Sequence, residues 1–148
     1  MPLVRDYIAE HERTTNFGGE AVRALDHGDY ERSRELLAAM AGELASHWRG
    51  EENGLFAIMR HDDLYAEHIA QLVAEHRDLQ ALLESVDLEN HDDRERVRTA
   101  IFELREHISK EEDGLFPASL TTLDGEDWDA AIAAWQDAHP GQHLIGRD

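Results

Sequence analysis

Several residue types that mark common protein classes are missing from this sequence. It contains no cysteine, so disulfides, zinc fingers and iron–sulfur clusters are excluded, and a bound metal must be held by nitrogen and oxygen atoms. It also has no run of about 18 apolar residues, and its N-terminal segment lacks the apolar core of a signal peptide. We therefore expect a soluble cytoplasmic protein that does not enter a membrane.

Basic residues are also scarce. Fourteen Lys and Arg face 33 Asp and Glu, which gives a formal net charge of −19 at pH 7. A chain of this charge repels phosphate backbones and anionic lipids, so nucleic acid is not an expected partner. The ten histidines are unusual in so acidic a chain, and charge does not account for them.

The length and composition favour one helical domain. A chain of 148 residues can bury one good core but not two. Only three prolines occur, and Ala, Leu, Glu and Arg recur throughout, which favours helix over sheet. We predict an all-α fold.

The most informative feature is an internal repeat. Residues 43–56 and 103–116, sixty positions apart, are identical at eight of fourteen positions when aligned without a gap. Each copy carries a histidine followed four residues later by a glutamate. On a helix this spacing places both side chains on one face, with Cβ atoms about 6 Å apart. Each copy therefore contains a pair able to hold one metal ion.

Apolar periodicity predicts four long helices. The first three cover about residues 2–27, 30–60 and 63–86. The fourth begins after a polar connection at residues 87–92, and Pro117 limits how far it can continue. Short connections predict an antiparallel up-down-up-down four-helix bundle over residues 1–120. A shorter amphipathic helix at about 127–138 lies in the remainder, residues 121–148, which we expect to pack across the bundle as a lid or brace.

Ionisable residues stand on the apolar stripes of all four predicted helices. Ala-Glu-His triplets place one histidine on the first helix and one on the third, and the repeated His-x-x-x-Glu motifs lie on the second and fourth. Burying six such groups at one depth is costly unless bound cations compensate them. The set indicates a dinuclear site for iron or manganese, with zinc as an alternative, and its residues are His11, His47, Glu51, His76, His107 and Glu111.

This ordered pattern resembles the hemerythrin-like family, also called the HHE cation-binding domain, over about residues 1–120. The resemblance implies two non-haem irons with an oxo or hydroxo bridge, and manganese or zinc rank behind iron. It implies that His11 and His47 serve one iron and that His76 and His107 serve the other. Glu51 and Glu111 would bridge the two. The implied ligand is oxygen, peroxide or nitric oxide, and we expect a monomer or homodimer.

The sequence departs from the family pattern at one position. Many members carry a fifth histidine one turn before His76, where this chain has Leu72. An open position on the second metal would favour reaction with peroxide or oxygen over reversible storage. The residues that could replace the missing ligand are His68, His139, His143 or a tyrosine, of which Tyr7 and Tyr65 lie nearest along the helices.

Other residues near the expected site carry weaker signals. We interpret most glutamates around the histidines as solvated, with a minority orienting imidazole rings; they are Glu10, Glu43, Glu75 and Glu103. Gly54 and Gly114 interrupt helical patterns, and we attribute both to close helix packing.

Several functions fit this pattern. The first is a di-iron protein that binds oxygen or disposes of peroxide, with catalase-like or peroxidase-like turnover left open. The others are a metal or oxygen sensor, an iron store or donor, and a di-iron oxygenase acting on an organic substrate. A pocket of substrate size beside the metals would favour the oxygenase. A bis-histidine haem bundle would leave Glu51 and Glu111 unexplained.

Overall fold

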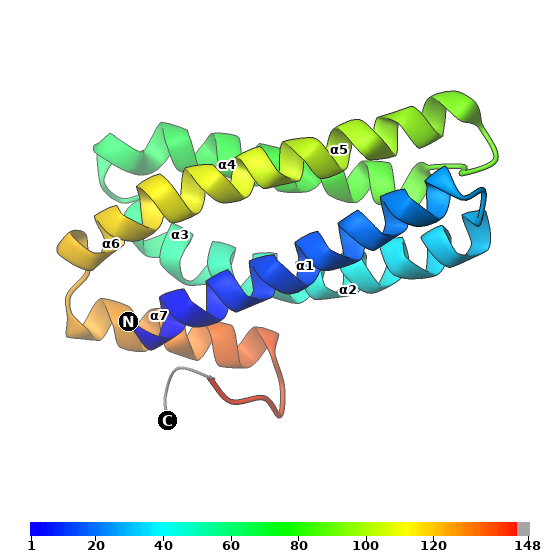
Figure 1. The fold of residues 1–148 in the computed structure, drawn as a ribbon. Helices are drawn as coiled ribbons and strands as arrows, with labels where there is room; N and C mark the ends of the chain where they lie inside the picture. Colours follow the sequence, from blue (N-terminus) through cyan, green and yellow to red (C-terminus); the bar gives the residue numbers. More distant parts are fainter. Residues whose placement is uncertain (145–148) are drawn as a thin grey trace.

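Four long helices form an antiparallel bundle. The computed structural model describes residues 1–144 and contains no strand among them. The bundle consists of α1 (Pro2–Asp26), α2 (Tyr30–Asn53), α4 (Asp63–Ser85) and α5 (His91–Lys110) (Figure 1). Helix α1 packs against α2 and α5, and α4 packs against the same two helices. The predicted all-α class and up-down-up-down arrangement are confirmed.

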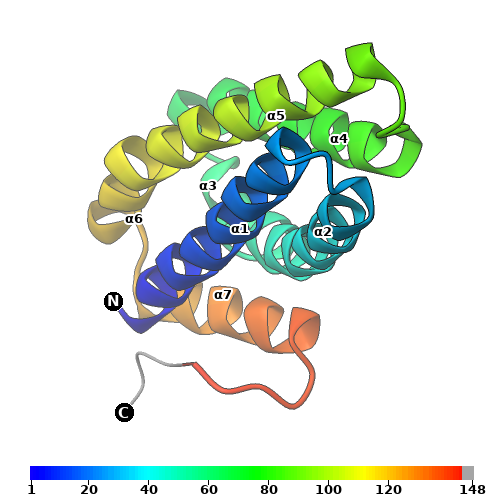
Figure 2. The ribbon, with the colours of Figure 1, turned by 45° about the vertical axis from the view of Figure 1, so that its right-hand side comes forward.

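A further helix lies across one end of this bundle. Helix α7 (Gly125–Ala138) packs against α2 and against α3 (Leu55–Met59), and α6 (Phe116–Thr122) leads into it. Figures 1 and 2 show α7 beside the N-terminus, on the side of α1 and α2. The predicted additional C-terminal helix is therefore present, and it packs against the bundle.

Polar residues fix where the helices begin. Four side chains accept a hydrogen bond from a backbone N–H in the first turn of the helix that follows, which satisfies one of its unpaired donors. These N-caps are Asp29, Asp62, Asn90 and Asp124. Gly28 leaves α1 with a φ of +73°, a conformation that few other residues adopt. Gly28 and the Asp29 cap together form the first interhelix turn.

The second helix ends earlier than expected. We predicted one helix over residues 30–60, but α2 stops at Asn53 and α3 restarts at Leu55. The break falls at Gly54, whose backbone angles are φ −106° and ψ −99°. A Cβ at Gly54 would lie 3.2 Å from the Cα of Ala131 in α7. Close packing against α7 therefore explains this glycine, as we expected.

The second copy of the repeat is distorted in a different way. Residues Glu111–Leu115 form a π-helical turn, η1, in which the Phe116 N–H donates to the Glu111 carbonyl. We expected Pro117 to limit this helix, but helical backbone continues through α6. The wider turn changes which backbone groups pair directly before Pro117. Proline has no N–H, so it could not donate one of the regular α-helical hydrogen bonds. Our packing explanation for Gly114 is wrong, because a Cβ there would meet no atom within 4 Å.

Two hydrophobic clusters fill the bundle and leave a polar layer between them. One cluster lies toward the α1–α2 and α4–α5 turns and is built around Met40, Leu44 and Ile101. The other is built around Leu3, Phe56 and Leu115, near α7. Buried histidines and glutamates occupy the positions between the clusters along each of the four helices. The fold therefore isolates one polar layer from solvent on both sides.

Within residues 1–144, no helix combines the length and the apolar character needed to cross a membrane. The cytoplasmic location inferred from the sequence stays a prediction.

The substitution Gly54→Ala should destabilise the protein. The new Cβ would lie 2.8 Å from the Gly50 carbonyl oxygen and 3.2 Å from the Ala131 backbone. Overpacking of this kind costs about 1–3 kcal/mol. Gly42→Ala in the same helix is the control, because its Cβ would meet nothing within 4 Å. Urea unfolding should show a lower midpoint for Gly54→Ala alone; equal midpoints would contradict the packing explanation.

Candidate metal centre

The structure brings all six predicted residues into one layer. His11 comes from α1, His47 and Glu51 from α2, His76 from α4 and His107 from α5, while Glu111 opens the π-helical turn η1. All six are at least 96% buried, and both glutamates are completely so. Two groups of side chains have donor atoms close enough to hold an ion: His11, His47, Glu51 and Glu111, and His76, His107 and Glu111.

The two glutamates connect the two pairs of histidines. In Glu51, one carboxylate oxygen lies 3.4 Å from His47 Nε2 and the other lies 3.6 Å from His76 Nε2. In Glu111, one oxygen lies 2.7 Å from His107 Nε2 and the other lies 3.2 Å from His11 Nε2. Each carboxylate therefore reaches both halves of the layer, as a bridging ligand must.

The histidines form two facing pairs. The Nε2 atoms of His11 and His47 are 3.1 Å apart, and those of His76 and His107 are 3.0 Å apart. Two imidazole lone pairs repel each other at this distance unless a proton or a cation lies between them. Two nitrogen donors at right angles, each about 2.1 Å from one ion, would be about 3.0 Å apart. The spacing of both pairs fits a shared metal ion.

A second set of carboxylates surrounds the histidines. The Nδ1 atoms of His11, His47 and His76 lie 3.1, 3.1 and 2.7 Å from their carboxylate partners, and His107 Nδ1 lies 3.6 Å from its own. An ionised carboxylate can only accept, so the Nδ1 atoms of His11, His47 and His76 carry the proton and their Nε2 atoms present a lone pair to the centre. The longer distance at His107 is not a hydrogen bond. In the order of the histidines, the partners are Glu112, Glu10, Glu52 and Glu75.

The repeat extends to this outer set. Glu52 and Glu112 directly follow Glu51 and Glu111, and Glu10 and Glu75 directly precede His11 and His76. Sequence reasoning identified Glu10 and Glu75 as candidates but missed Glu52 and Glu112, although the repeated Glu-Glu pair was a visible signal. The other two candidates do not contact the histidines. Glu43 pairs with Arg13, and Glu103 is exposed.

The C-terminal helix also contributes to this layer. His139 follows α7 and is 5% exposed, and its Nε2 pairs with the Glu10 carboxylate, which on its other side contacts His47. His139 Nδ1 lies 2.7 Å from the Trp135 carbonyl and donates to it. Burial raises the pKa of Glu10, but hydrogen bonds from His139 and His47 outweigh it and lower that pKa to about 2. Glu10 is thus held as an anion.

None of the histidines considered as substitutes for the missing fifth histidine joins either donor group in residues 1–144. His139 contacts Glu10 instead, His68 is half-buried on α4, and His143 is exposed. Tyr7 is buried and packs edge-on against the His47 ring, and Tyr65 packs against the cluster near α7. Leu72 is completely buried in that same cluster.

The inner carboxylates need a positive charge. The four oxygens of Glu51 and Glu111 are buried and have no partner in hydrogen-bonding geometry within the described residues. Burial and repulsion by Glu111 raise the pKa of Glu51 well above its usual range. Without a cation, burial would therefore protonate one of the two acids, while two divalent ions would neutralise both. The donor set fits a bound metal.

These features define a helical bundle with a buried metal site of imidazoles and bridging carboxylates. Comparison with family models gives the same assignment, because the hemerythrin HHE cation-binding domain matches residues 3–119. The chain belongs to this family, and membership implies that it binds a metal cation. No curated protein and no solved structure matched the chain. Helix α7 and His139 lie beyond the matched residues.

Removing the charge from one outer carboxylate should weaken metal binding. Glu52→Gln would keep an oxygen acceptor but lose the negative charge that pairs with the His76 ring, and such outer contacts change metal affinity by about 10–100-fold. Competition with a chromophoric chelator measures this change. Glu43→Gln is the matched control, because Glu43 lies on the same helix and contacts Arg13 rather than a histidine. Equal affinities for the two variants would show that Glu52 does not support the site.

The contact between His139 and Glu10 should make stability depend on pH in the metal-free protein. Pairing with Glu10 raises the pKa of His139 above 6.5 against the effect of burial, and the pKa of Glu10 falls from 4.5 to about 2. Both groups are charged, and the pair contributes fully, between about pH 4.5 and 6.5. Its contribution decreases as pH rises through the folded pKa of His139, and also as pH falls toward 2.

The variant His139→Gln tests this window, because glutamine keeps a donor but carries no charge. We expect its urea midpoint to fall below that of the parent protein at pH 5.5, and the difference to shrink at pH 9. His61→Gln, at an exposed turn, should change neither midpoint. An equal deficit at both pH values would contradict an ion pair.

Proposed function

We propose that this protein is a non-haem di-iron protein that binds or reacts with oxygen, peroxide or nitric oxide. The observation that carries the proposal is that Glu51 and Glu111 each reach both histidine pairs with oxygens that have no hydrogen-bond donor among residues 1–144. Two carboxylates in that position are suited to bridge two ions. As the family resemblance implies, His11 and His47 would hold one iron and His76 and His107 would hold the other.

Iron is the metal that the family resemblance favours, and the donor set is compatible with it. Four neutral imidazoles and two carboxylates supply nitrogen and oxygen but no thiolate, which suits iron or manganese and leaves zinc as an alternative. When bound, a pair of irons would supply reversible one-electron and two-electron chemistry to small oxygen species. The chain's own part is to orient the imidazoles through the outer carboxylates and to exclude water with two hydrophobic clusters.

The two halves of the site differ in a way that suggests where a ligand enters. His11 and His47 share one donor group with Glu51 and Glu111, whereas the donor group of His76 and His107 contains Glu111 alone, with Glu51 reaching only His76 of that pair, at 3.6 Å. Leu72, where many family members have a histidine, is apolar and buried. We therefore assign the open coordination position to the ion held by His76 and His107, where oxygen or peroxide would bind.

A second candidate function is a di-iron oxygenase acting on a small organic molecule. It is favoured by a cleft of about 130 Å³ that is lined by both His76 and His107. A pocket of this kind beside the metals is the feature that separates an oxygenase from a protein that handles only oxygen or peroxide. The two candidates share the same ions and differ in whether an organic molecule occupies the cleft.

Elemental analysis of protein purified without chelators tests the di-iron proposal. We expect two irons per chain and near-ultraviolet absorption that changes when the reduced protein meets oxygen or peroxide. Glu111→Gln should lower the iron content to one per chain or less, because Glu111 belongs to both donor groups. Glu103→Gln, eight residues earlier and exposed, should keep two. One metal per chain, or zinc alone, would overturn the proposal.

A further inference from the structure

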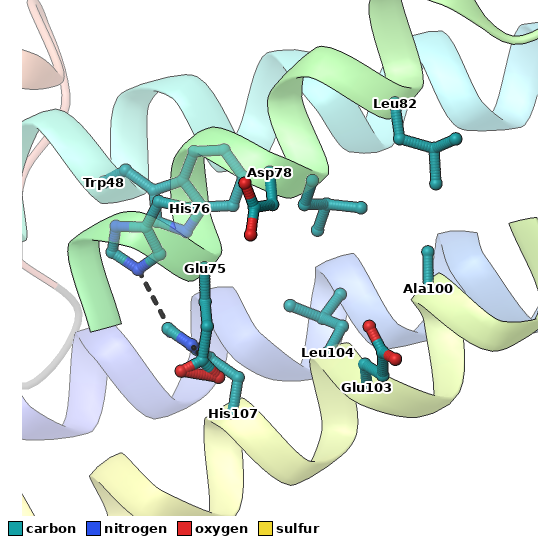
Figure 3. Close-up of a pocket in the computed structure, with 10 residues that line it drawn as sticks. Trp48, Glu75, His76, Asp78, Leu82, Ala100, Glu103, Leu104 and His107 are labelled. Atoms are coloured by element: carbon teal, nitrogen blue, oxygen red, sulfur yellow. Dashed lines mark hydrogen bonds and ion pairs between the residues drawn. The ribbon is translucent and has the colours of Figure 1, made fainter. Parts of the chain in front are cut away.

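A cleft between α4 and α5 leads from the surface to the metal centre. Figure 3 shows its residues on these two helices, with Trp48 of α2 behind them. The volume of about 130 Å³ is close to that of the roughly 150 Å³ engineered cavity known to accept benzene. The cleft is therefore large enough for one aromatic ring, and larger than a diatomic ligand needs.

The inner end of the cleft is formed by proposed metal ligands. His76 and His107 both line it, and a dashed line in Figure 3 marks the 3.0 Å contact between their Nε2 atoms. The Trp48 ring stacks on His76 with centroids 4.6 Å apart. His107 is 4% exposed, and its Nδ1 has no hydrogen-bond partner in the described residues. A molecule in the cleft would therefore reach the half of the site that contains His76 and His107.

The walls of the cleft are apolar. Leu79 of α4 and Leu104 of α5 are buried and line the cleft. Leu82 and Ala100 line it farther along the same two helices (Figure 3). Together with the indole of Trp48, these side chains surround a ring-sized volume with carbon atoms. Burying an aromatic ring among them is favourable, because it removes apolar area from water.

The charge of the cleft is of one sign. Three acidic residues line it, Glu75, Asp78 and Glu103, and neither a lysine nor an arginine is among its described lining residues. Lys110 neutralises only Glu75, which it contacts at 3.1 Å. Asp78 and Glu103 are exposed, so their carboxylates stand at the solvent end. An organic anion would meet repulsion there, whereas an ammonium or hydroxyl group would find acceptors.

We propose that this cleft binds a one-ring aromatic amine or alcohol, with the ring between Trp48, Leu79 and Leu104 and the polar group near Asp78 and Glu103. The inference rests on the proposed function for the chemistry that such a molecule would undergo. Binding itself needs only the walls of the cleft, so it can be measured in protein without metal.

Fluorine NMR titration with three probes of equal size tests the proposal: 4-fluorobenzylamine, 4-fluorobenzyl alcohol and 4-fluorobenzoate. We expect the amine and the alcohol to bind metal-free protein, and the benzoate to bind at least about tenfold more weakly than the amine. Asp78→Asn combined with Glu103→Gln should reduce the difference between amine and benzoate, because both changed residues are exposed and only their charge is removed. Equal affinity for all three probes in the parent protein would overturn the proposal.

Filling the cleft supplies the matched variant. Ala100→Phe places a ring on one wall and should abolish binding of the amine, whereas Ala39→Phe, at an exposed position of α2, should leave it unchanged. Circular dichroism and iron content, measured on both variants, separate a blocked cleft from a damaged fold. Unchanged amine binding by a folded Ala100→Phe variant would place the probe elsewhere and overturn the inference.

The two proposals can fail separately. Amine binding in a protein that takes up no iron would support the cleft and contradict the di-iron function. Two irons per chain without binding of amine or alcohol would support the di-iron function and contradict the cleft.

Discussion

The burial of two carboxylates between two hydrophobic clusters is the constraint on which the rest of this structure depends. Glu51 and Glu111 are shielded from water and have no hydrogen-bond donor among the described residues, so their charge has to be compensated from inside. The four histidines turn their Nε2 atoms toward them and their Nδ1 atoms toward outer carboxylates. The outer carboxylates orient the histidines, and the histidines face the inner carboxylates. A cation at the centre would bind the histidine nitrogens and compensate the charge of the inner carboxylates.

The sequence predicts much of this arrangement because the information is local and repeated. The His-x-x-x-Glu spacing places His47 with Glu51, and His107 with Glu111, on one helical face, and a three-to-four-residue rhythm brings His11 and His76 to the same side. The structure brings all six together as expected. The Asp29 and Asp62 caps were also predictable, because an N-cap acts within one turn.

The features that sequence reasoning missed depend on contacts between distant segments. Gly54 itself indicated close packing, but the break in the helix depends on Ala131 in α7, and nothing near residue 54 identifies that partner. His139 reaches Glu10 from the far end of the chain, so no spacing rule connects them. The helix continues past Pro117 only because a π-helical turn precedes it, and residue patterns rarely predict such turns. Only Glu52 and Glu112 were recoverable, from the repeated Glu-Glu pair.

His139 shows that the segment matched by the family is shorter than the segment that builds the site. Family resemblance ends at residue 119, yet the shell that orients His47 includes a side chain twenty residues later, carried there by α7. A fragment cut at the family boundary would keep every proposed ligand and lose part of what holds one of them in place. Family similarity thus covers the residues that identify the site, whereas the complete environment of the site includes residues farther along the chain.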